Sequence, residues 1–162
     1  MPQIPDNKDA CELLDADHIA VKHLFVEYAR LATAAPDDSA ADRTALALKI
    51  CAELTVHAQI EEEIFYPALR EALPDAGDLL EEAEAEHQEA KDLIAQIQAL
   101  GQADAEMDAL VARLNGAIEH HVKEERDELF PKAKAAPEVD LVALGEQLRQ
   151  RQAELAGQAA TT

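Results

Sequence analysis

The segment His57-Ala-Gln-Ile-Glu61-Glu-Glu-Ile-Phe-Tyr-Pro67 recurs 64 residues later as His121-Val-Lys-Glu-Glu125-Arg-Asp-Glu-Leu-Phe-Pro131. Each copy has a glutamate four residues after its histidine and a proline ten residues after it. Residues four apart share one face of a helix, so each copy can direct an imidazole and a carboxylate toward one point. Two such pairs in a small helical chain indicate a metal site, and more specifically a site for two ions.

The composition predicts a single helical domain. The chain has 162 residues, few glycines (5) and prolines (7), and an abundance of Ala, Leu, Glu and Gln, which favour helices. The net charge is -20, from 34 acidic and 14 basic residues. Such a surface repels phosphates and anionic lipids, so we expect neither nucleic acid nor a membrane as a partner.

The expected localisation rests on the membrane and secretion signals that the sequence lacks. No apolar run approaches the roughly 18 residues of a membrane span, and the N-terminus has no apolar signal-peptide stretch. Cys11 and Cys51 belong to no close motif, and we expect them to be small buried residues rather than reactive thiols. These features predict a cytoplasmic protein.

Hydrophobic periodicity and turn residues predict five helices, over residues 9–34, 40–66, 78–100, 103–130 and 137–155. Pro67 is expected to kink the second helix before a continuation to residue 73, and Pro131 to end the fourth. Ser39 offers an N-cap and Gly101 a C-cap. Short turns between long helices predict an all-α, up-down-up-down four-helix bundle with an additional C-terminal helix.

We divide the chain into an N-terminal arm (1–8), the bundle (9–135) and a C-terminal helix and tail (136–162), whose last six residues are expected to fray. A second repeat supports the bundle, because Asp15-Ala-Asp-His18 resembles Glu84-Ala-Glu-His87 at an offset of 69 residues. The chain therefore consists of two helical hairpins. Distances from the connecting turns place six side chains in one layer across the middle of the bundle: His18, His57, Glu61, His87, His121 and Glu125.

These six residues suit a site for two metal ions. A carboxylate has two oxygens and can span two ions, which assigns bridging roles to Glu61 and Glu125. Imidazoles fill the terminal positions as neutral ligands suited to iron and zinc. Ferritin-like bundles use Glu and Glu-x-x-His instead, so this site is richer in nitrogen. The residues alone leave iron, manganese and zinc open.

The order His, His-x-x-x-Glu, His, His-x-x-x-Glu resembles that of the hemerythrin-like family, also called HHE cation-binding domains. The resemblance spans about residues 10–135. It implies a non-heme centre of two iron ions, oxo- or hydroxo-bridged, and a small oxidant as partner: dioxygen, hydrogen peroxide or nitric oxide. The same family also includes sensors of iron or oxygen.

Two departures from oxygen-carrying hemerythrins bear on the activity. Those proteins have a further histidine where this chain has Lys91, and an aspartate five residues after the last histidine where this chain has Glu125 at four. A missing histidine opens a coordination position, which favours peroxide-decomposing (catalase-like) or oxidase chemistry over reversible oxygen carriage. No side chain stands out as a catalytic acid or base. The alternative is a non-enzymatic metal-binding or sensing module that acts through an unidentified protein partner.

Other histidines near the motifs are weaker candidates. His23 lies five residues after His18, about 140° around the helix, and is not expected to reach the site. His120 is the alternative to its neighbour His121, but alignment of Pro131 with the proline of the first copy favours His121.

Three further polar side chains are possible neighbours of the ligands. Lys22 and Lys91 lie one turn beyond a predicted ligand, and each is either a surface lysine or a partner for a carboxylate such as Glu62. Tyr28 is a candidate phenol beside the site. We expect Tyr66, like the phenylalanines, to belong to the core.

Overall fold

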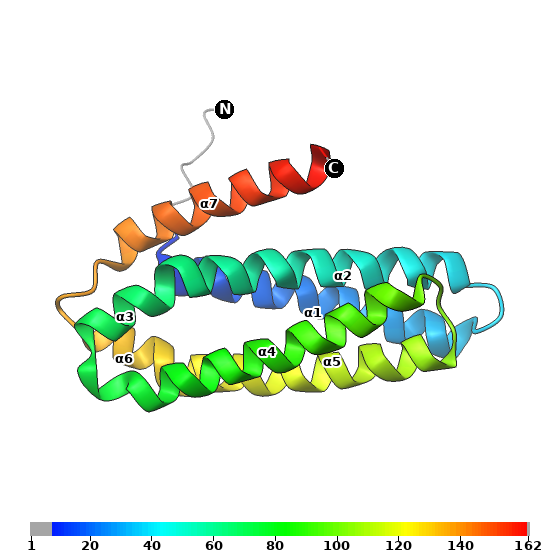
Figure 1. The fold of residues 1–162 in the computed structure, drawn as a ribbon, viewed down its shortest axis with the longest axis horizontal. Coiled ribbons are helices and arrows are strands. Elements are labelled where there is room, and N and C mark those ends of the chain that lie inside the picture. The colour runs from blue at the N-terminus through cyan, green and yellow to red at the C-terminus, as the bar shows by residue number, and fades with distance from the viewer. Residues whose placement is uncertain (1–7, 162) are drawn as a thin grey trace.

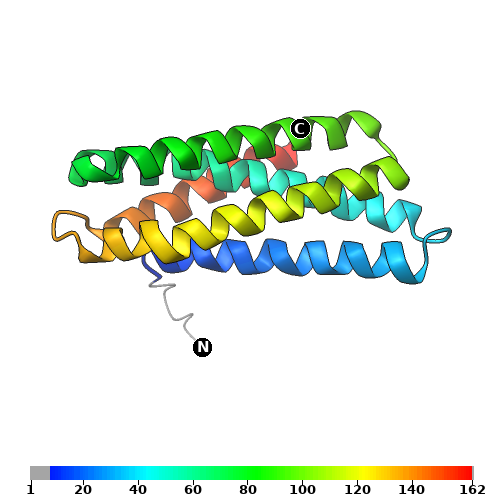
Figure 2. The same cartoon turned by 90° about the horizontal axis from the view of Figure 1, so that it is seen from below.

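Four long helices run antiparallel to one another, as Figure 1 and Figure 2 show from two sides. They are α1 (Ala10–Ala34), α2 (Ala40–Ile60), α4 (Gly77–Leu100) and α5 (Ala105–Glu124). Consecutive helices pack as neighbours and α5 returns to α1, which closes an up-down-up-down bundle. The structure is a computed structural model that describes residues 8–161, with side chains through residue 158, and this part of the chain contains no strand. The predicted all-α bundle with an additional helix is confirmed.

The helix ends follow the expected capping chemistry with one exception. Asp9 caps α1 by accepting from the Glu12 N–H at 2.9 Å, and the Glu12 side chain accepts in return from the Asp9 N–H. Gly101 ends α4 in the left-handed region, at φ 71°, as predicted. Ser39 does not cap α2 with its side chain, contrary to expectation. Its hydroxyl donates instead to the Leu31 carbonyl.

Helix α2 leads into a wide turn, η1 (Glu61–Phe65), that begins at the predicted ligand. The Tyr66 N–H donates to the Glu61 carbonyl five residues back, which is the hydrogen bond of a π-helix. Pro67 follows at the start of α3 (Tyr66–Ala72). A proline in an unbroken α-helix lacks an N–H and clashes with the carbonyl four residues earlier, and the wider turn accommodates both defects.

The second copy of the motif repeats this arrangement. The π turn η3 (Glu125–Leu129) begins at the second predicted bridging glutamate, and the Phe130 N–H donates to the Glu125 carbonyl. The chain then stays helical through Pro131 in α6 (Phe130–Ala135). The prediction that the fourth helix ends at Pro131 is therefore wrong. The π turn absorbs the proline that was expected to stop the helix.

The C-terminal helix α7 (Leu141–Thr161) lies outside the bundle against α1, α2 and η1 (Figure 1). It begins later than predicted because Asp140, and not Pro137, supplies the cap: its carboxylate accepts from the Ala143 N–H at 3.0 Å. It also continues to Thr161 rather than fraying after residue 156. A short 3₁₀ turn, η2 (Pro74–Ala76), joins α3 to α4. Apart from Lys8, the predicted N-terminal arm lies outside the described residues.

The apolar interior consists of two clusters with a polar layer between them. The first cluster includes Leu14, Leu69 and Leu148, and lies at the end covered by α7. The second includes Ile50 and Leu114, and lies toward the opposite end. Along each bundle helix the predicted ligands fall between members of the two clusters. None of the described helices combines the length and apolarity needed to cross a membrane.

Candidate metal centre

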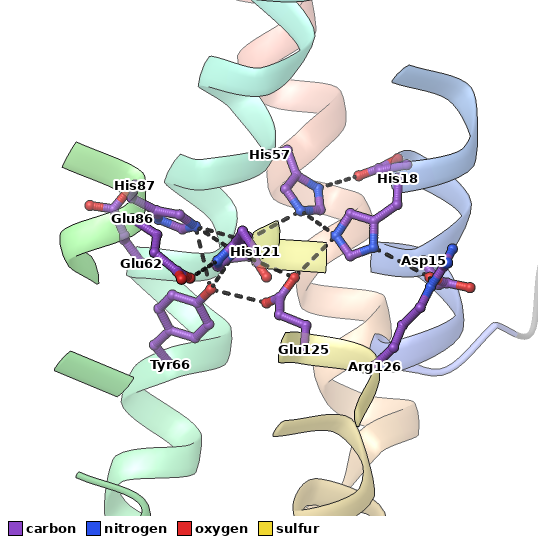
Figure 3. A network of polar contacts seen from close by, with 12 residues as sticks. Asp15, His18, His57, Glu62, Tyr66, Glu86, His87, His121, Glu125 and Arg126 are labelled. Carbon is purple, nitrogen blue, oxygen red and sulfur yellow. Dashed lines mark hydrogen bonds and ion pairs between the residues drawn. The ribbon is translucent and has the colours of Figure 1, made fainter. Parts of the chain in front are cut away.

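The structure brings the six predicted site residues together in the layer between the two apolar clusters (Figure 3). Each bundle helix contributes one histidine, and η1 and η3 each contribute the glutamate at their first residue. All six are buried: the histidines are 4–7% exposed and the glutamates 0%. In each His–Glu pair the two side chains lie on the same face of the helix, as their spacing of four residues predicted. The set is His18, His57, Glu61, His87, His121 and Glu125.

The histidines meet in pairs across each hairpin. The Nε2 atoms of His18 and His57 are 3.2 Å apart, and those of His87 and His121 are also 3.2 Å apart. Glu61 stands between the pairs, with its Oε1 atom 3.2 Å from His57 Nε2 and 3.1 Å from His87 Nε2. Its carboxylate therefore faces both hairpins.

Glu125 occupies the matching position on the other side of the layer. Its Oε1 atom lies 3.1 Å from His18 Nε2 and 3.5 Å from His121 Nε2. The tightest groupings cross between hairpins, because Glu125 groups with His18 and His57, whereas Glu61 groups with the other two histidines. Each group is a set of two nitrogens and one oxygen within 4.8 Å of one another.

The outer nitrogen of each of these four histidines faces a carboxylate, and of the four carboxylates only Glu62 was expected beside the ligands. The Nδ1 atoms lie 2.7–3.3 Å from a carboxylate oxygen in the pairs His18–Asp15, His57–Asp17, His87–Glu62 and His121–Glu86. An Nδ1–H that donates outward leaves the Nε2 lone pair directed inward, toward the centre. The repeated acidic residue before His18 and before His87 was the available signal for Asp17 and Glu86.

Two exposed cations stand behind these carboxylates. Lys91 Nζ lies 2.8 Å from Glu62, so this exposed lysine adopts the carboxylate pairing that the sequence left open as one of two alternatives. Arg126 Nε lies 2.6 Å from Asp15 (Figure 3). Both cations therefore support, through one carboxylate, the orientation of a histidine.

Tyr66 joins the centre, although the sequence placed it in the core. The side chain is 1% exposed, and its hydroxyl donates to Glu125 Oε2 at 3.0 Å. The Tyr66 hydroxyl oxygen also lies 3.2 Å from His121 Nε2 and 3.3 Å from His87 Nε2. The equivalent residue in the second repeat is Phe130, so the repeat gave no indication of a phenol here.

Burial and the two carboxylates together set the charge of the layer. Burial is the largest single influence on His57 and opposes its charge, but the Glu61, Asp17 and Glu125 carboxylates together outweigh it and raise the pKa of His57 to about 10. The same balance, with Glu125 as the largest opposing influence, raises the pKa of His121 to about 11. Burial and the charge of Glu61 raise the pKa of Glu125. The carboxylates thus create a buried field that favours cations.

Among the described residues, two buried oxygens, Glu61 Oε2 and Glu125 Oε1, accept no well-aligned hydrogen bond, although Glu125 Oε1 lies 3.1 Å from His18 Nε2. Buried carboxylate oxygens are costly unless a donor or a cation satisfies them. Here they lie among inward-directed imidazole nitrogens, a mixed nitrogen and oxygen set that suits iron, zinc or manganese. The residues therefore fit a metal centre on chemical grounds.

A small cavity adjoins the centre on the side of the second apolar cluster. Its volume is about 130 Å³, and all four histidines contribute to its wall. The rest of the wall is mostly apolar and includes Val21, Leu54 and Ile94, with Lys91 at the same cavity. A dry cavity of about 150 Å³ can hold a molecule as large as benzene, so this space admits only a small molecule.

The remaining sequence candidates lie elsewhere. His23 is exposed and stands in none of the three clusters of potential ligands among the described residues. His120 has a side chain that is 63% exposed and contacts Glu86 and Glu124 at the surface, 3.2 Å and 3.1 Å away. Tyr28 was predicted beside the site, and this is wrong. Its hydroxyl donates to Asp108 at 2.6 Å, within the second apolar cluster.

Lys22 is the counterpart of Lys91 in the first hairpin, but it does not pair with Glu62. It lines a groove of about 360 Å³ between α1 and α5. His18 and Arg126 line the same groove, so Lys22 remains close to the centre without holding a carboxylate of the layer.

A four-helix bundle with a buried layer of histidines and carboxylates defines a class of helical cation-binding domains. The sequence matches the hemerythrin HHE cation binding domain over residues 9–133, and the chain belongs to that family. A crystal structure of a hemerythrin HHE cation binding domain-containing protein from Mycobacterium kansasii is similar, with a TM-score of 0.76 and 28% identity over 95% of this chain and 91% of that one. Comparison with curated proteins finds no match. The family is the one that the sequence motifs resembled.

Proposed function

We propose that this protein is a non-heme di-iron protein that binds or reacts with a small oxidant, dioxygen or hydrogen peroxide. One observation carries the proposal: four imidazole Nε2 atoms and two carboxylates face one another in a buried layer, and two of the carboxylate oxygens accept no well-aligned hydrogen bond. Membership of a cation-binding family supports it. Iron, when bound, would supply the redox chemistry that no side chain here can provide.

The layer residues have distinct tasks in this proposal. The histidines would hold the ions through their inward-facing Nε2 atoms, and Glu61 and Glu125 would be shared between the ions, because each carboxylate contacts a histidine of each pair. The outer carboxylates fix the rings and their tautomers. Tyr66 places an O–H donor inside the layer, where it can hydrogen-bond to a ligand in the centre.

The cavity supports a small, uncharged substrate. Its size admits only a small molecule, and its largely apolar wall disfavours ions that would lose hydration on entry. Lys91 takes the place of a histidine found in oxygen carriers, and it engages Glu62 rather than the centre. We therefore propose reaction with the oxidant, in a catalase-like or oxidase sense, over reversible oxygen carriage.

The test is reconstitution with ferrous iron under anaerobic conditions, followed by metal analysis and absorption spectroscopy. The expected result is two irons per chain, one for each buried ligand group. Addition of hydrogen peroxide should then change the absorption spectrum and release oxygen. Failure to bind iron would overturn the proposal at its base. Binding of two irons with no response to peroxide or dioxygen would restrict it to metal binding.

A second candidate is a sensing module that signals through a protein partner. The observation in its favour is the position of α7, which packs against α1 and η1, two segments that carry site residues. A partner that binds only the metal-loaded or only the metal-free form, in a protein with no peroxide turnover, would favour this candidate.

A further inference from the structure

Helix α7 reaches the metal centre through one side chain. The Gln152 amide nitrogen donates to Asp17 Oδ2 at 2.8 Å, across 135 residues of sequence. The same oxygen lies 3.1 Å from His57 Nδ1, so one carboxylate oxygen receives both contacts. The Asp17 side chain is 24% exposed, and without Gln152 it has water as an alternative partner. Gln152 is therefore placed to orient the Asp17 carboxylate, which in turn orients the His57 ring.

The neighbouring residue of α7 makes a second contact to a ligand-bearing segment. Arg151 Nε lies 2.9 Å from Glu63 Oε1, in the π turn that begins at Glu61. The N-terminal end of α7 also packs closely, because a Cβ added at Gly145 would lie 2.7 Å from the Lys8 carbonyl oxygen. These contacts fix α7 over one side of the centre.

The hairpin formed by α4 and α5 has no equivalent hydrogen bond from α7 among the described residues. Glu86 holds His121 as Asp17 holds His57, but the second oxygen of Glu86 contacts the exposed His120 of its own hairpin. Among the hydrogen bonds and ion pairs of the described residues, none joins α7 to Glu86. The two histidine pairs thus have matching carboxylate partners, but only the partner of His57 is contacted by α7.

We propose that α7 is part of the metal centre, and that Gln152 is a positioning residue that raises the metal affinity of the His18–His57 position. This inference rests on the proposed metal site and adds to it a specific consequence: the two positions differ in affinity. Outer contacts of this kind commonly change metal affinity by about 10–100-fold. By reciprocity of linked equilibria, metal at this position also strengthens the docking of α7.

The first experiment compares Gln152→Ala with Gln150→Ala. Gln150 is an exposed residue of the same helix, and its side chain makes no hydrogen bond to another described residue. Mn²⁺ and Zn²⁺ serve as probes in chelator competition on the full chain. Gln152→Ala should lower the binding affinity for one of the two ions by about tenfold or more and leave the affinity for the other unchanged. Gln150→Ala should have the affinities of the wild type. Two ions with wild-type affinities in Gln152→Ala would overturn the inference.

A second variant separates positioning from a general loss of stability. Gln152→Glu keeps the size of the side chain but places a carboxylate against Asp17, so it should weaken the same ion more than Gln152→Ala does. Equal affinities in the two variants, or losses that follow their melting temperatures rather than the charge, would contradict a positioning role. Recovery of part of the affinity in Gln152→Asn would support it.

Hydrogen exchange provides a readout that does not depend on activity. Metal should slow exchange of α7 amides in the wild type, and this effect should be lost in Gln152→Ala while metal still protects α4 and α5. Exchange in α7 that ignores metal would overturn the coupling. A wild-type chain that binds no metal would instead refute the proposed function, so the two failures are distinguishable.

Discussion

The two hairpins of this bundle carry the same set of proposed metal ligands in different surroundings. In each, the acidic residue before the first histidine holds the second histidine, as Asp17 holds His57 and Glu86 holds His121. The residues after the bridging glutamates differ, because Glu62 accepts from His87 whereas its counterpart Arg126 binds Asp15. One hairpin supplies a phenol and lies under α7, and the other has neither.

This difference shows which parts of an internal repeat a metal site constrains. Ligand type and spacing must persist in both copies, since each ion needs nitrogen and oxygen donors at defined positions. The charges one contact further out are free to change, provided that each Nδ1 retains an acceptor. Two positions built from one repeat can therefore differ in affinity and reactivity.

We expect the greatest loss of metal binding when a carboxylate that contacts both histidine pairs is removed. Glu61→Ala should abolish binding at both positions and not only at one, because its oxygen contacts a histidine of each pair. Glu125→Ala should do the same. The measurement is iron per chain after anaerobic reconstitution. Glu119→Ala, at an exposed glutamate of α5, is the control, and retention of one full equivalent in either variant would refute a bridging role.

The two halves can be weakened separately through the carboxylates that hold His57 and His121. Asp17→Asn should lower affinity by about 10–100-fold at the first position only, and Glu86→Gln by a similar factor at the second only. Chelator competition with Mn²⁺ measures each step. If the two variants gave the same two-step profile, the halves would not be separable in this way.

A smaller effect is expected from the cations behind Glu62 and Asp15. Lys91 and Arg126 are each 46% exposed, and such surface ion pairs contribute about 1 kcal/mol or less. Lys91→Ala and Arg126→Ala should therefore change metal affinity by less than about tenfold, each in its own half. High salt should reduce even this difference. A larger loss in either variant would show that its cation does more than hold a carboxylate.

The smallest effect concerns the thiols in the two apolar clusters. Burial raises the pKa of Cys11 to about 12 and that of Cys51 to about 11, so neither is a thiolate near pH 8. Both should remain unreactive toward a disulfide reagent in the folded chain and react fully in denaturant. Raising the pH toward 11 should expose Cys51 to reaction first. Rapid reaction of either thiol at pH 8 would contradict the packing of its cluster.

The repeats predicted the bundle and selected the six residues that the structure brings together, because residue spacing and helical periodicity are local properties. What it could not predict depends on contacts between helices. Periodicity places Glu61 on a face but does not reveal that it groups with the histidines of the other hairpin. Tyr66 was expected in the core and does pack in the first apolar cluster, but the hydrogen bond from its hydroxyl to Glu125 depends on a contact between helices. Gln152 lies far from every motif in sequence, and only the docking of α7 reveals it.

The polar layer has a consequence for how the molecule unfolds. It separates two apolar clusters, so in the metal-free chain cooperativity between the ends of the bundle must pass through desolvated imidazoles and carboxylates. Ions held by residues from all four helices would tie the two clusters into a single cooperative unit. Metal would then sharpen the thermal transition as well as raise its midpoint.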